Sequence, residues 1–408
     1  MKQTRPITIT GGRLVLADGL RDGSARLVDG RIAALGDVAA QDGDEIVQAR
    51  GQLVAPGLVD FGVFAVDKPA FHFGGIIRAA LMPDQRPPLD LPSRVNYIAK
   101  SGKPDLWVHP LAAATQGLEG DKLAELALMR EAGARGVATG RRWIADSGVM
   151  LRLLRYAAML DLVVVTHAED AGLTGEAVAT AGEMATRMGL ASSPAEALAI
   201  ARDLALAEMA GARLHIRQVT TRAGLALVRA AKARGLAVTI GVTPAHIHLS
   251  DLAIGDFRSF ARLSPPLRPE GDRQSVLEAI ADRTIDVIAS GHDPRGPEDK
   301  RLPFADAAAG MAGAEVLLAT TLGLVRDGVI DLARAFALLA GNPARLLGVE
   351  AGQLREGHEA DIALIDPDRP WIVDTDKMAA SAGNTPFDGQ PMQGRVEALW
   401  KGGMRVGA

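Results

Sequence analysis

The sequence predicts an α/β protein with two parts, a (β/α)8 barrel of the TIM type and a small β-sandwich formed by both ends of the chain. The first supporting observation is a run of alternating elements from Leu58 to about Val349, in which short apolar strands precede Ala/Leu/Glu/Arg-rich helical stretches. Repeated units of this kind imply a parallel sheet, and their number favours a closed barrel over an open doubly wound sheet. We therefore assign residues 57–349 to the barrel.

The second observation is the strand-like pattern of the two ends. Residues 6–55 alternate short apolar runs with turn signals, and "ADIALIDPDRPWIVD" and "GRVEALWKGGMRVG" near the C-terminus return to the same pattern. Neither end has enough residues to bury a core alone. We therefore expect 1–56 and 350–408 to pair with each other in one small β-sandwich.

The third observation concerns the connection between the first two barrel strands. The first strand should end near Phe64 and the second should begin at Ile76, which leaves eleven residues between them. A crossover between neighbouring parallel strands needs about a dozen residues or more. We expect the first outer helix to be missing or vestigial, about one turn at most. The uncovered apolar flank would favour contact with another chain, in a homo- or hetero-oligomer.

Composition and charge exclude several classes of function. Charged residues make up 23% of the chain and the formal net charge is -4, which argues against nucleic acid and anionic membrane as partners. The sequence has no run of eighteen uncharged apolar residues and no apolar leader, so we expect a cytoplasmic protein. Because the chain has no cysteine, any metal would depend on its eight histidines and on carboxylates.

Candidate site residues are sought at the carboxyl ends of the barrel strands, where such barrels carry their reacting groups. Those ends hold Gly62, Phe64, Asp84, Thr115, Thr139, Gly140, His167, Gln218, His246, Gly291, His292 and Asp293. A zinc centre needs three or four converging N, O or S donors, so a single imidazole cannot hold the metal. We interpret His167 as a hydrogen-bonded interior histidine.

Two other groups are weak candidates. His246 and His248 could face the same side and form a ligand pair, but we favour a polar loop. His292 and Asp293 have the composition of an acid/base pair, but adjacent residues at a strand end point in opposite directions. We expect Asp293 to point away from the site.

An ordered series of motifs runs almost from end to end of the chain. It includes "APGLVD" at 55–60, "LMPDQRPPLD" at 81–90, "THAED" at 166–170, "RLHIRQVTT" at 213–221, "VTPAHIHLSD" at 242–251, "SPPLRPEGDR" at 264–273, "IASGHDPRGPEDK" at 288–300 and "NTPFDGQPMQG" at 384–394. On these motifs the chain resembles the dihydroorotases of the amidohydrolase superfamily, specifically the longer bacterial type that accompanies aspartate carbamoyltransferase. The resemblance implies a metal-bearing barrel that opens or closes the dihydroorotate ring.

The same resemblance implies a nearly empty site. Two metal ligands and a substrate-binding arginine of the family fall at Gly62, Phe64 and Val66, and a bridging aspartate falls at Thr139 or Gly140. A later metal histidine falls at Gln218, and the aspartate that serves as metal ligand and general base falls at Gly291. Of the implied ligands only His167 is kept. The remaining family positions of the pocket are Asp84, Ala245, Ser264 and Arg295.

We therefore expect no catalytic residue, no metal and no cofactor, and a degenerate pocket in which Asp84 would repel an anionic ligand. The leading hypothesis is a non-catalytic dihydroorotase-like subunit of pyrimidine biosynthesis that binds aspartate carbamoyltransferase. One alternative is an active dihydroorotase or related cyclic amidohydrolase with a rebuilt zinc site from His167, His246, His292 and Asp293. Another is a sensor that binds a small molecule in the old pocket without chemistry.

Overall fold

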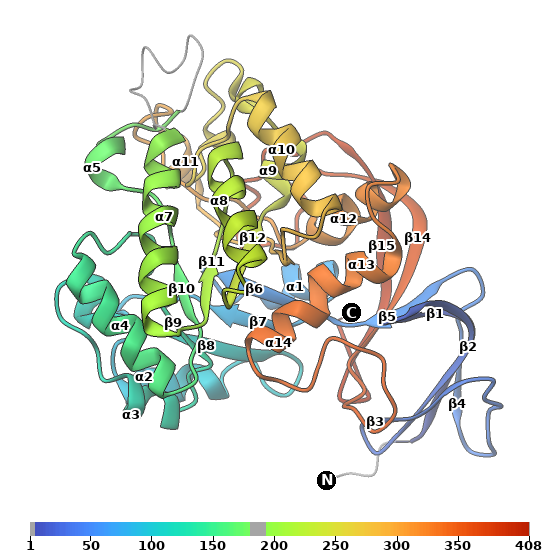
Figure 1. Ribbon diagram of the computed structural model, residues 1–408. Coiled ribbons are helices and arrows are strands. Elements are labelled where there is room, and N and C mark those ends of the chain that lie inside the picture. The colour runs from blue at the N-terminus through green and yellow to red at the C-terminus, as the bar shows by residue number, and fades with distance from the viewer. Residues whose placement is uncertain (1–4, 180–192, 408) are drawn as a thin grey trace.

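The barrel is a sheet of eight parallel strands in which neighbours in sequence are neighbours in space. The structure is a computed structural model that describes residues 5–179 and 193–407. The strands are β6 (Leu58–Val63), β7 (Ile76–Leu81), β8 (Trp107–Ala113), β9 (Gly136–Ala138), β10 (Val164–Thr166), β11 (Leu214–Ile216), β12 (Val238–Val242) and β13 (Val287–Ile288). The predicted barrel is confirmed (Figure 1).

Side-chain and backbone hydrogen bonds close the sheet between β13 and β6. Phe64 N, just after β6, donates to His292 O at 2.9 Å. Ser290 N donates to Asp60 Oδ1 at 2.9 Å, and the Ser290 hydroxyl donates to the other oxygen of the same carboxyl. Burial raises the pKa of Asp60, which lies in the barrel wall without solvent contact. The first and last strands are thus joined across a seam that has no regular ladder.

Helices cover the outside of the barrel (Figure 1). The longer ones are α2 (Pro92–Lys100), α3 (Leu126–Glu131), α4 (Ser147–Met159), α7 (Ser193–Ala210), α8 (Arg222–Ala233), α10 (Glu270–Ala281) and α12 (Leu317–Arg326). Shorter ones are α5 (Ala171–Thr174), α9 (Pro244–His248), α11 (Pro297–Lys300), α13 (Leu332–Phe336) and α14 (Asn342–Leu346), with short turns η1 (Gln116–Leu118), η2 (Asp251–Ile254), η3 (Ser259–Ala261) and η4 (Ala337–Gly341). No helix among the described residues is long and apolar enough to cross a bilayer.

Local sequence explains where these helices start and which face they bury. Asp146 caps α4 by accepting from Val149 N at 2.7 Å. Thr221 caps α8 in the same way, by accepting from Gly224 N at 3.1 Å. The buried face of α8 repeats Leu225, Val228 and Ala231 at helical spacing.

The connection after β6 corrects one prediction. It contains a seven-residue helix, α1 (Lys68–Gly74), so the first outer helix is short but longer than the single turn expected. Gly75 has φ 81° and ends the helix directly before β7, which lets a short segment hold both a helix and the return. A Cβ at Gly74 would lie 2.2 Å from Ala314 O, so α1 packs close to the chain that precedes α12.

The expected uncovered flank of β6 and β7 is also wrong. Every residue of both strands is buried within this one chain. The C-terminal strands β14 (Ile362–Ile372) and β15 (Pro391–Lys401) reach α1 beside them. The ring of Phe73 in α1 lies 5.5 Å from that of Trp371 in β14, and the Arg395 guanidinium of β15 lies 4.7 Å from the Phe73 ring.

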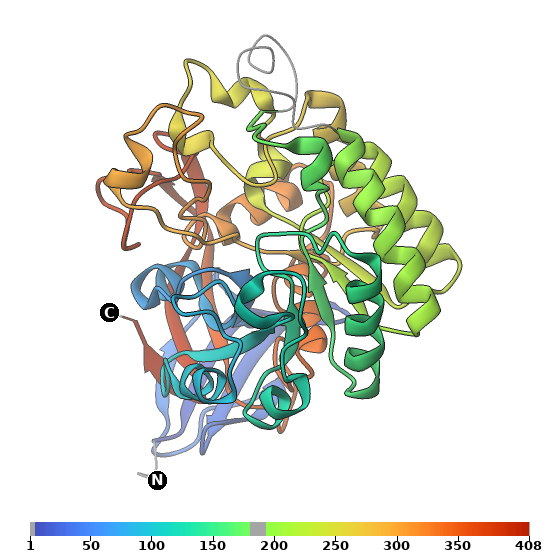
Figure 2. The same ribbon diagram turned by 90° about the vertical axis from the view of Figure 1, so that its left-hand side faces the viewer.

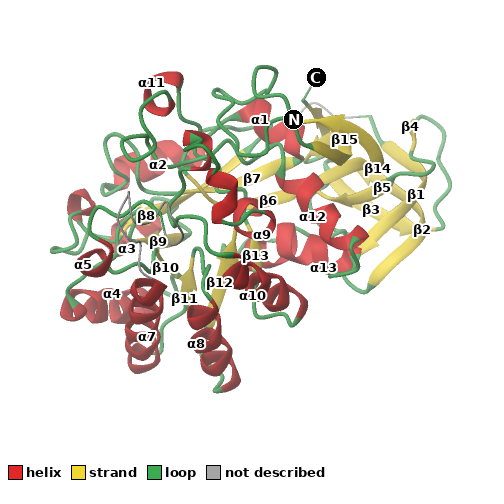
Figure 3. Cartoon of the chain, turned by 90° about the horizontal axis from the view of Figure 1, so that it is seen from above, coloured by secondary structure: helices red, strands yellow, loops and turns green. Residues whose placement is uncertain are grey.

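Both ends of the chain form one further sheet. It contains β1 (Ile7–Leu16), β2 (Gly19–Val28), β3 (Arg31–Gly36), β4 (Glu45–Gln48), β5 (Leu53–Pro56), β14, β15 and β16 (Met404–Val406). The antiparallel pairing of β5 with β14 joins the two ends, which lie near each other in Figure 2. The pairing of the ends is confirmed, although they share one continuous hydrogen-bonded sheet. It lies at the side of the barrel in Figure 3.

A buried ionic cluster ties this sheet to the barrel. Asp361, just before β14, accepts from Arg78 Nε of β7 at 2.8 Å and from Lys401 Nζ of β15 at 2.9 Å. All three side chains are buried. Glu359 completes the cluster, with one oxygen paired to Arg78 and the other 2.8 Å from Lys401 Nζ.

Candidate functional site

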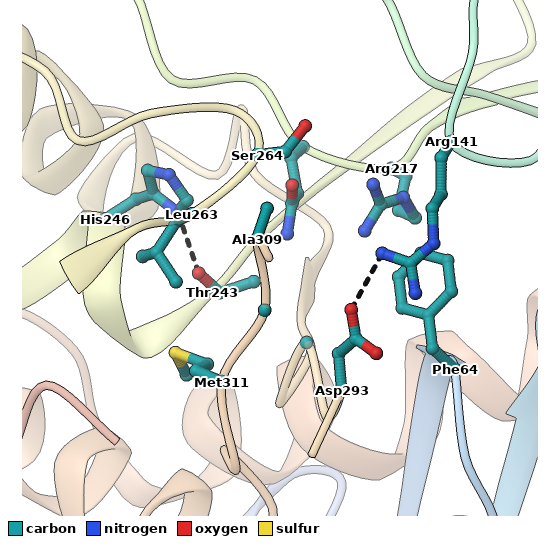
Figure 4. A pocket seen from close by; sticks show the side chains of 13 residues that line it. Phe64, Arg141, Arg217, Thr243, His246, Leu263, Ser264, Asp293, Ala309 and Met311 are labelled. Carbon is teal, nitrogen blue, oxygen red and sulfur yellow. Dashed lines mark hydrogen bonds and ion pairs between the residues drawn. The ribbon is translucent and has the colours of Figure 1, made fainter. Parts of the chain in front are cut away.

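The carboxyl ends of the barrel strands surround a small pocket (Figure 4). Its lining residues are Phe64, Arg141, Arg217, Gln218, Thr243, His246, Leu263, Ser264, Gly291, Asp293, Ala309, Gly310 and Met311. Sequence analysis placed Phe64, Gln218, Ser264 and Gly291 here, and the structure brings them together with His246 and Asp293. Asp84 and His167 do not line the cavity but contact its arginines.

The cavity is too small for a ring-shaped substrate. Its volume is about 30 Å³, whereas small-molecule sites have volumes of roughly 300–1,000 Å³. It can hold ordered water, and Arg217 Nε and Gln218 Oε1 are buried polar atoms without a partner among the described residues. The same volume argues against a sensor that would bind a pyrimidine intermediate here without rearrangement.

Two arginines that sequence analysis missed fill the centre of the pocket. Arg141 Nη1 lies 2.7 Å from Asp293 Oδ2, and its guanidinium lies 3.6 Å from the centroid of the Phe64 ring. Arg217 lies 4.9 Å from the same centroid. Figure 4 shows both guanidinium groups beside the ring. The available signal was position, because Arg141 follows Gly140 after β9 and Arg217 directly follows β11.

Arg217 occupies the space beside the one retained family ligand. It is buried, which lowers the pKa of its guanidinium to about 10, and its Nη2 lies 3.4 Å from His167 Nδ1. His167 Nε2 lies 3.6 Å from Glu169 Oε2. A Cβ at Gly62 would lie 3.4 Å from Arg217 Cδ. The arginine side chain therefore takes up the room between His167 and the position where the family has its first ligands.

Asp84 faces these cations instead of the cavity. Its Oδ1 accepts from Arg141 N at 2.9 Å, and a Cβ at Gly140 would lie 2.8 Å from that oxygen. Burial raises the pKa of Asp84, against the opposing effect of Arg141 and Arg217. Asp84 does not line the cavity, and its expected repulsion of an anionic ligand stays a prediction.

The neighbours His292 and Asp293 point to opposite sides, as predicted. His292 Nε2 lies 3.6 Å from Asp67 Oδ2, and its ring lies 5.3 Å from that of Phe71, outside the pocket. Asp293 lines the pocket, which corrects the expectation that it points away. Arg295 Nη2 donates to Asp293 Oδ2 at 3.1 Å. Two arginine side chains therefore hold this carboxylate.

His246 and His248 do not form a ligand pair, and they lie in the short helix α9 instead of the expected polar loop. His246 Nε2 donates to Pro265 O at 3.0 Å, so its Nδ1 accepts from the Thr243 hydroxyl at 2.7 Å. Burial lowers the pKa of His246 to about 4, which keeps the ring neutral. His248 Nε2 instead lies 3.1 Å from Thr320 O of α12. Both nitrogens of His246 are thus engaged within the chain.

The donor set does not fit the metal centre that the resemblance implies. Gly62 and Gly291 have no donor, Phe64 has an aromatic ring, and Gln218 has a neutral amide. Within residues 5–179 and 193–407, no group of three or more His, Cys, Asp or Glu side chains is arranged to hold a metal ion. Thr139 Oγ1 accepts from His167 N at 3.3 Å. These residues provide one imidazole where a zinc centre needs three or four donors.

The barrel, the terminal sheet and the pocket at the carboxyl ends of the strands together define a TIM-type barrel protein with an added β-sheet. A family model for dihydro-orotase-like proteins matches residues 51–224. The dihydroorotase of Pelotomaculum thermopropionicum is 37% identical over 419 aligned residues, covering 98% of each chain. That of Syntrophotalea carbinolica is 37% identical and covers 96% of each chain. The chain belongs to the dihydroorotase family.

Solved structures agree with this fold. The L-hydantoinase (dihydropyrimidinase) from Arthrobacter aurescens superposes with a TM-score of 0.89 at 23% identity, over 99% of this chain and 96% of that one. The dihydropyrimidinase from Brevibacillus agri superposes with a TM-score of 0.86 at 20% identity, over 98% and 95%. At these identities the likeness supports the fold alone.

Restoring the acidic residue at position 291 is expected to fail. Gly291 has φ +62°, and a Cβ there would lie 2.9 Å from Thr243 Cγ2. Gly291→Asp should lower the free energy of unfolding by about 1–3 kcal/mol and leave dihydroorotate hydrolysis at background. Gly296→Asp is the matched control, because Gly296 has φ -65° and open space around its Cα. Measurable turnover by Gly291→Asp would contradict this interpretation of the pocket.

Proposed function

We propose that this member of the dihydroorotase family does not catalyse ring hydrolysis and acts as a structural or regulatory subunit in pyrimidine biosynthesis. The observation that carries the proposal is the filled pocket. Arg217 lies against His167, Arg141 holds Asp293, and the remaining cavity has a volume of about 30 Å³.

The chemistry of amide hydrolysis supports this proposal. It requires an activated water, a proton acceptor and a group that stabilises charge on the carbonyl oxygen. Gly291 has no side chain to accept a proton. Asp293, the one carboxylate of the described residues that lines the cavity, is paired with Arg141 and Arg295. Each 1.36 kcal/mol of lost transition-state stabilisation lowers the rate tenfold. Loss of two of these functions would reduce turnover to background.

Aspartate carbamoyltransferase is the proposed protein partner. The support is the resemblance to the dihydroorotase type that accompanies this transferase, together with an intact fold around a filled pocket. The buried strands β6 and β7 lend no support, since they leave no apolar flank exposed. Co-expression followed by size-exclusion chromatography should give one co-eluting complex. Two separate species, with the transferase unchanged in stability and activity, would contradict the proposal.

An active cyclic amidohydrolase is the second candidate, because relatives 37% identical over nearly the whole chain are named dihydroorotases. It would need a rebuilt zinc site from His167, His246, His292 and Asp293. In the present arrangement both nitrogens of His246 are engaged and His292 faces Asp67. The candidate therefore requires a rearrangement of the strand ends.

Metal content and turnover separate the two candidates. We expect purified protein to contain far less than one zinc per chain by inductively coupled plasma mass spectrometry. Dihydroorotate hydrolysis should equal the buffer blank, while the dihydroorotase of Pelotomaculum thermopropionicum serves as the positive control. Stoichiometric zinc together with turnover would establish the second candidate and reject the first.

A further inference from the structure

A second, much larger cavity lies at the opposite end of the barrel from the filled pocket. Its volume is about 650 Å³, within the range of roughly 300–1,000 Å³ for small-molecule sites. The amino-terminal parts of β7 and β8, the end of α2 and the residue before β9 form one side, and turns of the terminal sheet form the other. Neither the family resemblance nor the proposed function accounts for this cavity.

A buried histidine without a partner lies in its wall. His109 of β8 is 7% exposed, and its Nε2 has no hydrogen-bond partner among the described residues. Burial and the positive charges of Arg78, Arg135, Lys103 and Lys401 lower the pKa of this imidazole to about 3. The ring is therefore neutral and lies in a region of positive potential. A buried polar atom without a partner is uncommon and indicates a missing ligand or water.

The cations around the cavity outnumber the carboxylates. The cations are Arg31, Arg78, Lys103 and Arg135. The carboxylates are Asp29, Glu350 and Glu359. Glu359 is already paired with Arg78 and Lys401. Asp29 and Glu350 are exposed at the rim, as are Arg31, Lys103 and Arg135, so solvent screens the charges of both signs there.

Three of these cations, Arg31, Lys103 and Arg135, have no carboxylate partner among the described residues, and Arg31 Nη1 donates to Gly357 O at 2.7 Å. Neither Arg135 nor Lys103 forms an ion pair or a side-chain hydrogen bond with the described residues, and Lys103 Nζ lies 4.8 Å from the centroid of the Trp107 ring. Arg78 lies 4.4 Å from the same centroid, so the indole forms a rigid wall beside these charges. Two uncommitted cations and a neutral imidazole that can donate from Nε2 match a doubly charged anion with several acceptor oxygens.

We propose that this cavity binds the phosphoryl group of a small phosphorylated molecule, with Lys103 and Arg135 neutralising its charge and His109 donating a hydrogen bond to it. A phosphate offers the two negative charges and the acceptor oxygens that these groups require. Free inorganic phosphate and a nucleoside monophosphate share this chemistry, and the volume accommodates either. The site is independent of the filled pocket and of the proposed loss of catalysis.

Isothermal titration calorimetry on the full chain tests the proposal. Inorganic phosphate and uridine monophosphate are the probes, at an ionic strength held constant with sodium chloride. Uridine, which lacks the phosphoryl group, is the ligand control. We expect saturable 1:1 binding of at least one phosphorylated probe and none of uridine. Tighter binding of uridine monophosphate would identify a nucleotide as the source, and equal affinity would identify free phosphate. Absence of saturable binding by both probes would overturn the proposal.

Charge-removing variants locate the binding. Arg135→Gln and Lys103→Gln should each raise the dissociation constant about fivefold, because an exposed charge pair changes binding affinity by up to about fivefold. The double variant should raise the dissociation constant further. Arg155→Gln is the matched control, since Arg155 is an exposed arginine of α4 that does not line the cavity. Unchanged affinity in the double variant would overturn the proposal.

A substitution at His109 distinguishes a binding role from a structural one. His109→Leu removes the imidazole, whose Nε2 has no partner in the described chain, so the thermal midpoint without ligand should change little. Its affinity for the phosphorylated probe should fall at least about fivefold. A lower midpoint with unchanged affinity would show that His109 only supports the fold.

Discussion

Replacement of Glu196 by alanine is expected to lower the free energy of unfolding by about 3–5 kcal/mol. Glu196 lies in the first turn of α7 and is 1% exposed. Its carboxylate accepts from the backbone nitrogens of Thr220 at 3.0 Å and Thr221 at 2.8 Å, and also from both threonine hydroxyls. Without it, two buried backbone N–H groups lose their acceptor.

The expected effect is large because the N–H and O–H donors of Thr220 and Thr221 are buried beside the pocket. Thr220 and Thr221 form the turn after β11 that follows Arg217 and Gln218 into α8, so Glu196 holds one wall of the filled pocket. Burying a donor without an acceptor costs about 1–3 kcal/mol per group. Urea-induced unfolding, followed by circular dichroism, measures the change.

Glu208→Ala is the matched control for this prediction. Glu208 lies on the same helix, is about half exposed and pairs with Arg234 at 3.4 Å. An exposed pair of this kind contributes up to about 1 kcal/mol. Equal destabilisation by Glu196→Ala and Glu208→Ala would show that the Glu196 hydrogen bonds are unimportant for stability.

The barrel could be predicted from sequence because each strand has a local signature. Segments such as "LVVVT" before His167 are short, apolar and β-branched, and each leads into a helical stretch. Once parallel strands alternate with helices, the right-handed crossover leaves few arrangements. The pairing of the two ends could also be predicted, since neither end could bury a core alone.

The covering of β6 and β7 could not be predicted because it depends on contacts between distant segments. Phe73 and Trp371 are far apart in sequence, yet their rings meet at 5.5 Å. The length of the connection suggested that no proper helix would fit. A helix does fit, because the left-handed backbone of Gly75 ends α1 and leads directly into β7 without a longer loop.

The loss of donors in the site could be predicted, but the groups that replace them could not. Strand alternation predicts that His292 and Asp293 point apart, and it does not say which one faces the pocket. Long arginine side chains have many rotamers, so their final contacts depend on the whole site. Arg141 and Arg217 were therefore missed although both lie at strand ends.

Replacement of Asp361 by alanine is expected to be of similar severity, about 3–5 kcal/mol. The carboxylate is 6% exposed and accepts from Arg78 Nε, Lys401 Nζ and Gly402 N at 2.8–3.0 Å. Its removal leaves two buried cations with Glu359 as their one remaining carboxylate. A buried charge without a counter-ion destabilises the fold far more than the removal of both partners does, because the remaining ion has lost its hydration.

The position of the cluster also sets where unfolding should begin. Arg78 belongs to the barrel strand β7, whereas Asp361 directly precedes β14 and Lys401 ends β15 of the terminal sheet. Asp361→Ala should therefore expose the β14 and β15 region to limited proteolysis before the barrel strands are cut. Asp368→Ala is the matched control, because Asp368 is an exposed residue of β14 whose carboxylate has no partner among the described residues. If Asp361→Ala unfolds at the same urea concentration as Asp368→Ala, the cluster does not hold the two parts together.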